Sequence, residues 1–334
     1  MKKLLFIIVC LLLTAVACAP TVKVKRWAAA KYDIKGVKKV GFMNFNTRLN
    51  AGTRAGMIIP ETLEKGLVEN GYFKVSSRIQ DSYDETIKIE GMDPKDMLVV
   101  GGKPDVDAVV RGEVSAYLVD SQRSTKTVQR EVVSGSRTEY YTENGVQKTR
   151  EVPVKVKKDF IEPYVVKKAL IDFSVDVQNE KERKSIGQGR FRDEKSEDAV
   201  GNSDIARLSS DDSMLKSILN GLTKAFVSEM APHEVRYTIK LEKVEQCKDS
   251  NKLAQKGQWD DALSCWQGVY PETASTKYNI GVFFEATGDF EEAYNSYREA
   301  MRLENKQFYF QAASRANAYT IDAKKLQSQV EGEK

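Results

Sequence analysis

A long stretch of alternating apolar and polar residues, from residue 106 to residue 191, constrains the fold of this chain most strongly. Such alternation indicates half-buried β-strands, because successive side chains of a strand point to opposite faces. In VDAVVRGEVSAYLV, residues 106–119, charged and small polar residues occupy one face. The apolar face of this strand is predicted to hold Val106, Ala108, Val110, Val114, Ala116 and Leu118. A sheet is therefore the first element that the fold must contain.

The middle of the alternating stretch predicts extended arms that project from the sheet. Residues 120–178 are rich in Thr, Val, Lys and Arg, and Asn144-Gly145 is the strongest short signal for a hairpin turn. The returning strand carries Val152, Val154 and Val156 on one face. Farther along, a second apolar row consists of Val165, Ala169, Ile171, Phe173, Val175 and Val177. The segment SIGQGRF, 185–191, is expected to pair back against this strand.

Shorter elements flank these strands and complete a first domain over 34–243. Residues 37–45 predict a strand, and a helix is expected to begin near Pro60 and end at Gly71, followed by another strand. A later helix, 213–230, has an apolar face formed by Leu215, Ile218, Leu219, Leu222 and Phe226. The last strand is predicted to direct inward Val235, Tyr237, Ile239 and Leu241.

The N-terminus carries an apolar run, LLFIIVCLLLTAVA, that ends at Cys18. A membrane-spanning helix needs roughly 20 apolar residues, so this run is short for one and suits the core of a signal peptide. The small residues before Cys18 resemble the lipobox of bacterial lipoproteins. In that family the cysteine is lipidated and becomes the first residue of the mature protein, and palmitate is among the expected lipid chains. The resemblance implies a leader over 1–17 and a lipid-anchored tether over 18–33. An ordinary secretory signal and a retained anchor are the alternatives.

The residue after the cysteine indicates which membrane would hold the protein. Ala19 stands where lipoproteins held at the inner membrane typically carry aspartate. The lipoprotein resemblance therefore implies an anchor in the outer membrane, with the body of the protein facing the periplasm.

Two stretches of the C-terminal region, KGQWDDALSCWQGVYP and TGDFEEAYNSYREAMRLEN, align with each other at an offset of 31 residues. The matching pairs are Gly257 with Gly288, Trp259 with Phe290, Ala262 with Ala293, and Trp266 with Tyr297. The pattern resembles a tetratricopeptide (TPR) repeat, whose period is near 34 residues. Gly281 and Ala293 would let two helices approach closely, with Phe284, Phe290 and Tyr297 filling the space between them. Asn305 departs from the family, which usually has proline there. We expect an all-α TPR-like domain over 244–334.

Two cysteines remain in the mature body, Cys247 and Cys265. In an exported protein such a pair is a disulfide candidate. We expect the two residues to lie in the antiparallel helices of the first repeat unit, where a bond would contribute about 3 kcal/mol. The alternative is two small buried apolar side chains.

Charge and motifs exclude several classes of function. With 52 basic and 48 acidic residues, the formal charge of +4 argues against a general nucleic-acid binder. The single histidine, His233, has no Cys/His cluster around it in the sequence, and no GxSxG motif occurs. We therefore expect no catalytic residue, no metal site and no cofactor, and predict that the protein is not an enzyme.

The strand VKKVGFMNF, the helix ETLEKGLVENG, and the strands YFKV and DAVVRGEV follow one another in an order that resembles the curli-secretion lipoprotein (CsgG-like) superfamily. That group includes penicillin-binding-protein activator (LpoB-like) lipoproteins. The resemblance implies a CsgG-like mixed-sheet α/β domain, to which the residue pattern adds the extended β-hairpin arms. Together with the TPR helical hairpin array expected to follow it, the chain is predicted to be an α+β protein. The resemblance also implies a lipid-tethered module that binds envelope proteins or assembles with copies of itself.

These features predict a non-enzymatic outer-membrane lipoprotein that serves as an interaction scaffold or assembly factor. Candidate partner-binding residues of the repeat unit are Tyr278, Phe283 and Tyr294. A pore-forming secretion subunit of the curli-channel type and an activator of a peptidoglycan synthase are the alternatives. Charged residues on the arms, such as Lys126 and Arg130, weigh against the pore, because each costs roughly 2 to 4 kcal/mol at the middle of a membrane.

Overall fold

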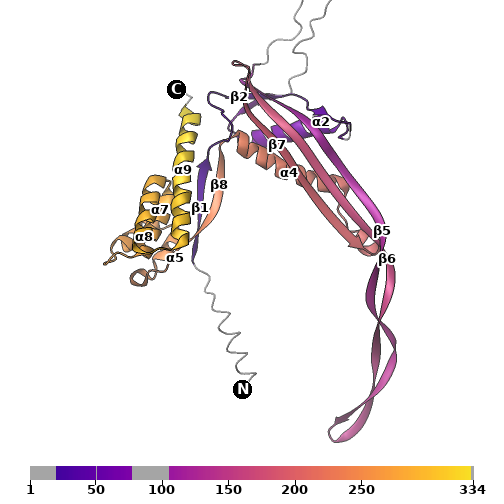
Figure 1. Cartoon of the computed structure of the whole chain (residues 1–334). Helices are drawn as coiled ribbons and strands as arrows, with labels where there is room; N and C mark the ends of the chain where they lie inside the picture. Colours follow the sequence, from indigo (N-terminus) through magenta and orange to yellow (C-terminus); the bar gives the residue numbers. More distant parts are fainter. Residues whose placement is uncertain (1–19, 50, 77–104, 332–334) are drawn as a thin grey trace, which may run out of the picture. The chain divides into compact units, whose positions relative to one another are not determined.

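The computed structural model describes residues 20–49, 51–76 and 105–331, which form two compact units (Figure 1). One unit joins the N-terminal residues up to Val37 to the C-terminal part from Ser228 onward, and the other spans Lys38–Val227. The chain is an α+β protein with parallel and antiparallel pairing in the same sheet, as the sequence predicts.

The unit Lys38–Val227 is built on a sheet with the order β4-β2-β5-β6-β7, to which β3 adds by pairing with β5. Its strands are β2 (Lys39–Phe42), β3 (Asn46–Thr47), β4 (Lys74–Ser76), β5 (Ala108–Glu143), β6 (Val146–Asn179) and β7 (Lys184–Val200). β2 runs parallel to β4 and β5, whereas β5, β6 and β7 are antiparallel neighbours. The predicted pairing of 185–191 against the preceding strand is confirmed, and it continues to Val200.

Three helices accompany this sheet: α2 (Ala55–Asn70), α3 (Asn202–Ile205) and α4 (Asp211–Met230). Gly71 ends α2 with a φ of 77°, a left-handed conformation that glycine adopts without strain, as predicted. The helix begins before Pro60, which lacks a backbone N–H and so leaves the carbonyl of Gly56 without its helical donor. That carbonyl instead accepts a hydrogen bond from the Phe45 N–H at 2.9 Å.

Helices α2 and α4 contribute to a core rich in phenylalanine. Phe173 and Phe191 stack with ring centroids 5.3 Å apart, and Phe226 of α4 contacts Phe191 edge-on at 5.9 Å. The two helices approach closely at Gly66, where an added Cβ would lie 2.5 Å from the Thr223 methyl carbon. The predicted apolar face of α4 is buried, and so is the predicted apolar row of β6 from Val165 to Val177, which confirms both predictions.

The predicted apolar face of residues 106–119 is wrong beyond Val114. Val114 pairs with Phe173, but Ala116 pairs with Asp172, so Ser115 is an extra residue in β5. A β-bulge of this kind reverses the alternation, because two residues of one strand oppose one residue of its neighbour. Ala116 and Leu118 therefore share the face of Asp172, and Leu118 is 36% exposed.

The other unit combines a two-stranded antiparallel ribbon with helices. The ribbon pairs β1 (Thr21–Ala28) with β8 (His233–Lys240). The helices are η1 (Glu245–Cys247), α5 (Ser250–Gln255), α6 (Trp259–Gln267), α7 (Ala274–Thr287), α8 (Phe290–Leu303) and α9 (Gln307–Glu331). Val22, Val24 and Ile239 on the inner face of the ribbon join the buried cluster that contains Trp266 and Tyr297.

Two predictions about the domain boundaries differ from this arrangement. Within the tether expected over 18–33, Thr21–Ala28 instead form β1 and belong to the folded unit. The first domain was expected to extend to residue 243, whereas the compact unit around the large sheet ends at Val227. The reason is that β8 pairs with β1, more than 200 residues away in the sequence, and its inner face packs on the helices.

Helix α9 forms hydrogen bonds with β1 and with the segment that follows it. Gln329 is buried, and its side-chain oxygen accepts from the Ala30 N–H at 3.0 Å while its nitrogen donates to the Ala30 carbonyl at 3.1 Å. Arg26 donates to Asp322, and its guanidinium lies 3.8 Å from the ring centre of Tyr319. Helix α9 therefore binds the N-terminal segment of the chain.

Candidate functional site

The hairpin of β5 and β6 continues far beyond the edge of β7. The last pair between β6 and β7 is Tyr164 with Val200, and the Gly201 N–H donates to the Pro163 carbonyl at 2.8 Å. Beyond this point residues 125–163 have no strand partner except one another, and we call them the arm (Figure 1). At about 3.4 Å per residue, each strand of the arm is roughly 60 Å long. Asn144 (φ 52°) and Gly145 (φ 77°) form the turn at its tip, as predicted.

The two faces of the arm differ in character. Val128 pairs with Phe160 and Val132 with Val156. We call the row that these side chains form the valine face: Val128, Val132, Val152, Val154, Val156 and Phe160. Its valines are half-buried, and Phe160 is 39% exposed. The opposite face pairs Glu131 with Lys157 and Gln129 with Asp159, and it also carries the exposed Val133 and Ile161. The valine face is therefore distinguished by the continuity of its apolar row and not by an absence of charge.

Ion pairs along the arm compensate most of its charge. The shortest contacts are Arg130–Glu162 at 2.7 Å, Arg137–Glu139 at 2.7 Å, Lys148–Glu143 at 2.6 Å, Arg150–Glu139 at 3.0 Å and Lys155–Glu131 at 3.8 Å. Hydrogen bonds from Arg150 and then Arg137 hold the pKa of Glu139 below its usual value. Exposed pairs of this kind contribute about 0 to 1 kcal/mol each. They therefore contribute little to the stability of the arm.

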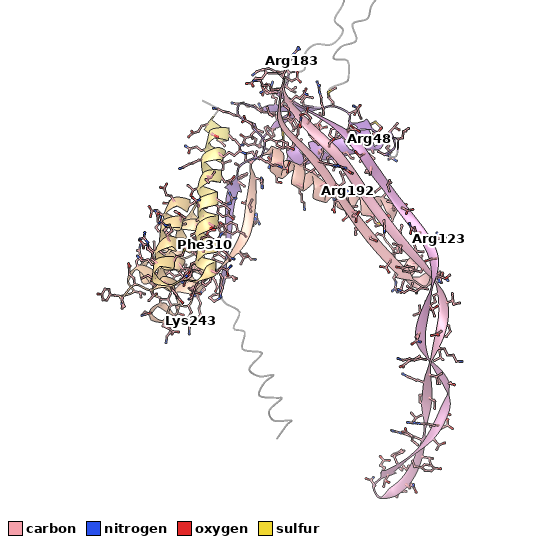
Figure 2. All side chains as sticks on the ribbon, viewed as in Figure 1. Arg48, Arg123, Arg183, Arg192, Lys243 and Phe310 are labelled. Carbon is pink, nitrogen blue, oxygen red and sulfur yellow. A yellow bond between two sulfur atoms is a disulfide. The ribbon has the colours of Figure 1, made fainter. Side chains whose placement is uncertain are left out.

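An isolated two-stranded hairpin is at best marginally stable in water, and independent stability requires a third strand or a packed face. Among the described residues of its own unit, no third strand pairs with the arm, and Figure 2 shows no other strand or helix along most of its length. The arm is thus a long, charge-compensated ribbon with one uncovered apolar row. That combination suits a surface that a second molecule covers.

The repeat unit brings the predicted packing residues together. Ala262, Trp266, Phe290, Ala293 and Tyr297 are buried. Trp259 and Phe284 are partly buried against the same cluster. Gly281 allows the close approach of α7 and α8, because a Cβ there would lie 2.6 Å from ring carbons of Tyr297. These residues build the core of the helical unit, and their assignment to a TPR array stays a prediction.

The proposed partner surface on these helices is wrong for Tyr278. Its side chain is only 3% exposed, its hydroxyl donates to the Lys240 carbonyl at 3.0 Å, and burial raises its pKa. Phe283 and Tyr294 are half-buried, with Phe283 in edge contact with Trp259 at 6.3 Å. The ring of Tyr278 packs against Tyr297 and Tyr309 in the core and cannot contact a partner.

A buried ionic network in the helical unit was not predicted from the sequence. The carboxylate of Glu285, whose side chain is fully buried, accepts from Arg315 at 2.7 and 2.9 Å and from the Tyr297 hydroxyl at 2.6 Å. Burial, and then the neighbouring Glu285 charge, raise the pKa of Tyr297 well above its usual value. A charged residue inside the apolar segment VFFEA was the available signal. The network is enclosed in the core, so it has a structural role.

The remaining predicted sites carry little chemistry. Cys247 and Cys265 form a disulfide in the structure, with Cα atoms 6.0 Å apart, although Cys247 lies in η1 and not in a repeat helix. Cys18 and the leader lie outside the described residues. The Nδ1 atom of His233 lies 3.1 Å from the Ala231 carbonyl oxygen. Over residues 20–49, 51–76 and 105–331, no group of three metal-binding side chains occurs. In the same ranges, no helix has the length and hydropathy to span a membrane.

Comparisons with known proteins match parts of the chain. Residues 248–326 match a family described as a domain of unknown function (DUF6340). No curated protein sequence matches. The PelC dodecamer from Paraburkholderia phytofirmans is 11% identical, with a TM-score of 0.28 over 63% of this chain and 98% of PelC. A neuraminyllactose-binding hemagglutinin homologue from Helicobacter pylori is 14% identical, with a TM-score of 0.27 over 59% of this chain and 86% of that one. Likeness at this level transfers neither a function nor an assembly.

Proposed function

We propose that this protein is a non-enzymatic outer-membrane lipoprotein, facing the periplasm, that binds a partner protein through its arm. The observation that carries the proposal is the valine face, an apolar row on a two-stranded ribbon that its own unit leaves uncovered. Packing that row against a partner would supply the stabilisation that an isolated hairpin lacks. The helical unit, with a core closed around Trp266 and Tyr297, can offer a second surface.

A water-soluble partner fits the arm better than the interior of a membrane. Arg130 and Lys158 are register partners on the same face as the valines, between the Val128 and Val132 levels. Each would cost roughly 2 to 4 kcal/mol at mid-membrane. At a protein interface the long side chains of these two residues can extend past the apolar row, so that their charges stay hydrated.

The arm is tested by removing its apolar row without removing its strand character. Val132→Thr, Val154→Thr and Val156→Thr combined keep β-branched side chains but make the face polar. The matched control combines Glu131→Thr, Lys155→Thr and Lys157→Thr on the opposite face.

We expect the valine-face variant to migrate as a smaller complex than the wild type when detergent-solubilised envelopes are separated on native gels. The control should retain the wild-type size. Equal migration of both variants and the wild type would refute the role of the arm. A complex that survives urea extraction as a ring-sized species would instead support the pore-forming alternative.

The proposed lipid anchor is tested separately at Cys18. We expect labelled palmitate to be incorporated into the wild type and not into Cys18→Ser, and we expect that variant to leave the membrane fraction. If Cys18→Ser labels or fractionates like the wild type, the proposed lipid anchor is refuted, while the proposal for the arm is unaffected.

A further inference from the structure

The ribbon of β1 and β8 has an outer face that the core of its unit does not use. Val22, Val24 and Ile239 point inward to the helices, so the alternate residues point outward. The exposed outward side chains include four cations, Lys23, Lys25, Arg236 and Lys240. Trp27 lies on the same face and is 56% exposed. We call these five residues the basic face.

The charges of the basic face are only partly compensated. Lys25 and Arg236 are register partners, and like charges directly opposite each other destabilise a strand pair. The carboxylate on this face, Glu234, lies 2.5 Å from Arg236 and 3.9 Å from Lys25, so one negative charge serves two cations. An anion would relieve the remaining repulsion.

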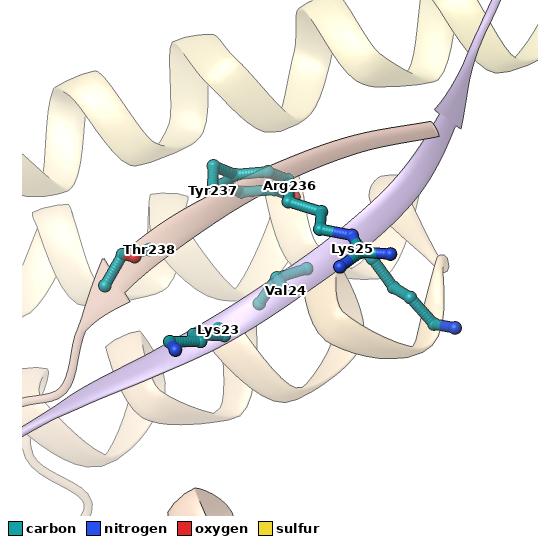
Figure 3. Close-up of a pocket in the computed structure, with 6 residues that line it drawn as sticks. All are labelled: Lys23, Val24, Lys25, Arg236, Tyr237 and Thr238. Carbon is teal, nitrogen blue, oxygen red and sulfur yellow. The ribbon is translucent and has the colours of Figure 1, made fainter. Parts of the chain in front are cut away.

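The surface beside these cations is hollowed. A depression of about 470 Å³ is lined by Lys23, Val24, Lys25, Arg236, Tyr237 and Thr238 (Figure 3). Figure 3 shows Lys23, Lys25 and Arg236 extending from the two neighbouring strands. The side chains of Lys23, Lys25 and Arg236 therefore border a space that can admit a phosphate group.

We infer that the basic face binds the anionic phospholipid headgroups of a bilayer surface. Tryptophan is enriched at the level of membrane headgroups, because its ring is apolar and its N–H needs a hydrogen-bond acceptor. Each Lys or Arg near an anionic bilayer strengthens binding by about fivefold. Trp27 and the cations together form the combination that such a surface recognises.

The position of β1 in the chain supports a bilayer as the source of the phosphate. Thr21, where the ribbon begins, is three residues from Cys18, and three extended residues span at most about 10 Å. This step rests on the proposed lipid anchor. The affinity itself does not, since the unlipidated protein should also bind anionic vesicles.

The test measures cosedimentation of the leaderless Cys18→Ser protein with two kinds of vesicle, phosphatidylcholine alone and phosphatidylcholine mixed with phosphatidylglycerol. One variant combines Lys23→Gln, Lys25→Gln and Arg236→Gln. The charge-matched control combines Lys148→Gln, Lys155→Gln and Lys157→Gln on the arm. All six side chains are exposed, so both variants should unfold at the wild-type temperature.

We expect binding to the phosphatidylglycerol vesicles, weakened about a hundredfold by the ribbon variant and left within about fivefold of wild type by the arm control. Trp27→Ala should weaken the binding as well. Equal binding to both vesicle types, or equal weakening by the two triple variants, would overturn the inference. Binding to soluble polyphosphate without binding to vesicles would overturn it too, by assigning the face to a free anion. None of these results depends on palmitate labelling, so failure here is distinct from failure of the anchor.

Discussion

The ionic network of the helical unit allows a quantitative test of how its core is held together. Replacing Glu285 with Leu leaves the guanidinium of Arg315 and the Tyr297 hydroxyl without their acceptor. Breaking a buried ion pair from one side costs about 3 to 5 kcal/mol. Because the Arg315 side chain is 30% exposed and can reach water, we expect Glu285→Leu to lower the free energy of unfolding by about 3 kcal/mol.

Replacing Arg315 instead of Glu285 should lower the free energy of unfolding further. Arg315→Met leaves the carboxylate of Glu285 fully buried without its cation, so about 5 kcal/mol is expected. In the double variant neither charge remains, and the loss should fall to about 2 kcal/mol, mainly from the unpaired Tyr297 hydroxyl. The double variant is thus expected to be several kcal/mol more stable than the sum of the single losses implies.

Urea unfolding followed by tryptophan fluorescence measures these differences. All three tryptophans of the chain, Trp27, Trp259 and Trp266, belong to the helical unit, so the signal reports on that unit. Single losses that add in the double variant to within about 0.5 kcal/mol would refute the reasoning, because independent sites behave in that way.

Three further outcomes are expected. Gly281→Ala should destabilise the helical unit by about 1 to 3 kcal/mol through its clash with Tyr297. Gly268→Ala in the same unit, where a Cβ would lie no closer than 3.4 Å to its neighbours, should be nearly neutral, and equal urea midpoints of the two variants would contradict this. The double serine variant of Cys247 and Cys265 should unfold with about 3 kcal/mol less stability, and thiol alkylation of unreduced wild type at both cysteines would disprove the bond. Because the pKa of Tyr297 is raised in the folded protein, its stabilising contribution is present below about pH 10 and is lost as the pH rises toward the pKa of the folded state. Tyr297→Phe should therefore reduce the loss of unfolding free energy at alkaline pH. An unchanged dependence of stability on pH would contradict this.

Local signals made much of the fold predictable. Gly71 and the Asn144-Gly145 turn require left-handed backbone conformations, which few residues other than Gly and Asn adopt readily. The apolar row of α4 and the row from Val165 to Val177 have a single period over their whole length, so their buried faces follow directly from the sequence.

The features that escaped prediction depend on residues far apart in the chain. β1 is short, and its alternation has meaning only beside β8, its partner from the other end of the sequence. The bulge at Ser115 changes which face each later residue occupies, and no residue type marks it. Glu285 and Arg315 lie on different helices, and their pairing follows from the packing of α7 against α9 and not from a motif.

The central claim, that the valine face of the arm contacts another protein, is tested most directly by photo-crosslinking in intact cells. A benzophenone amino acid replaces Phe160 on the valine face in one full-length variant and Asp159 on the opposite face in the other. We predict an adduct of one defined mass from position 160 and little or none from position 159. Absence of an adduct at 160, or the same adducts from both positions, would contradict the account.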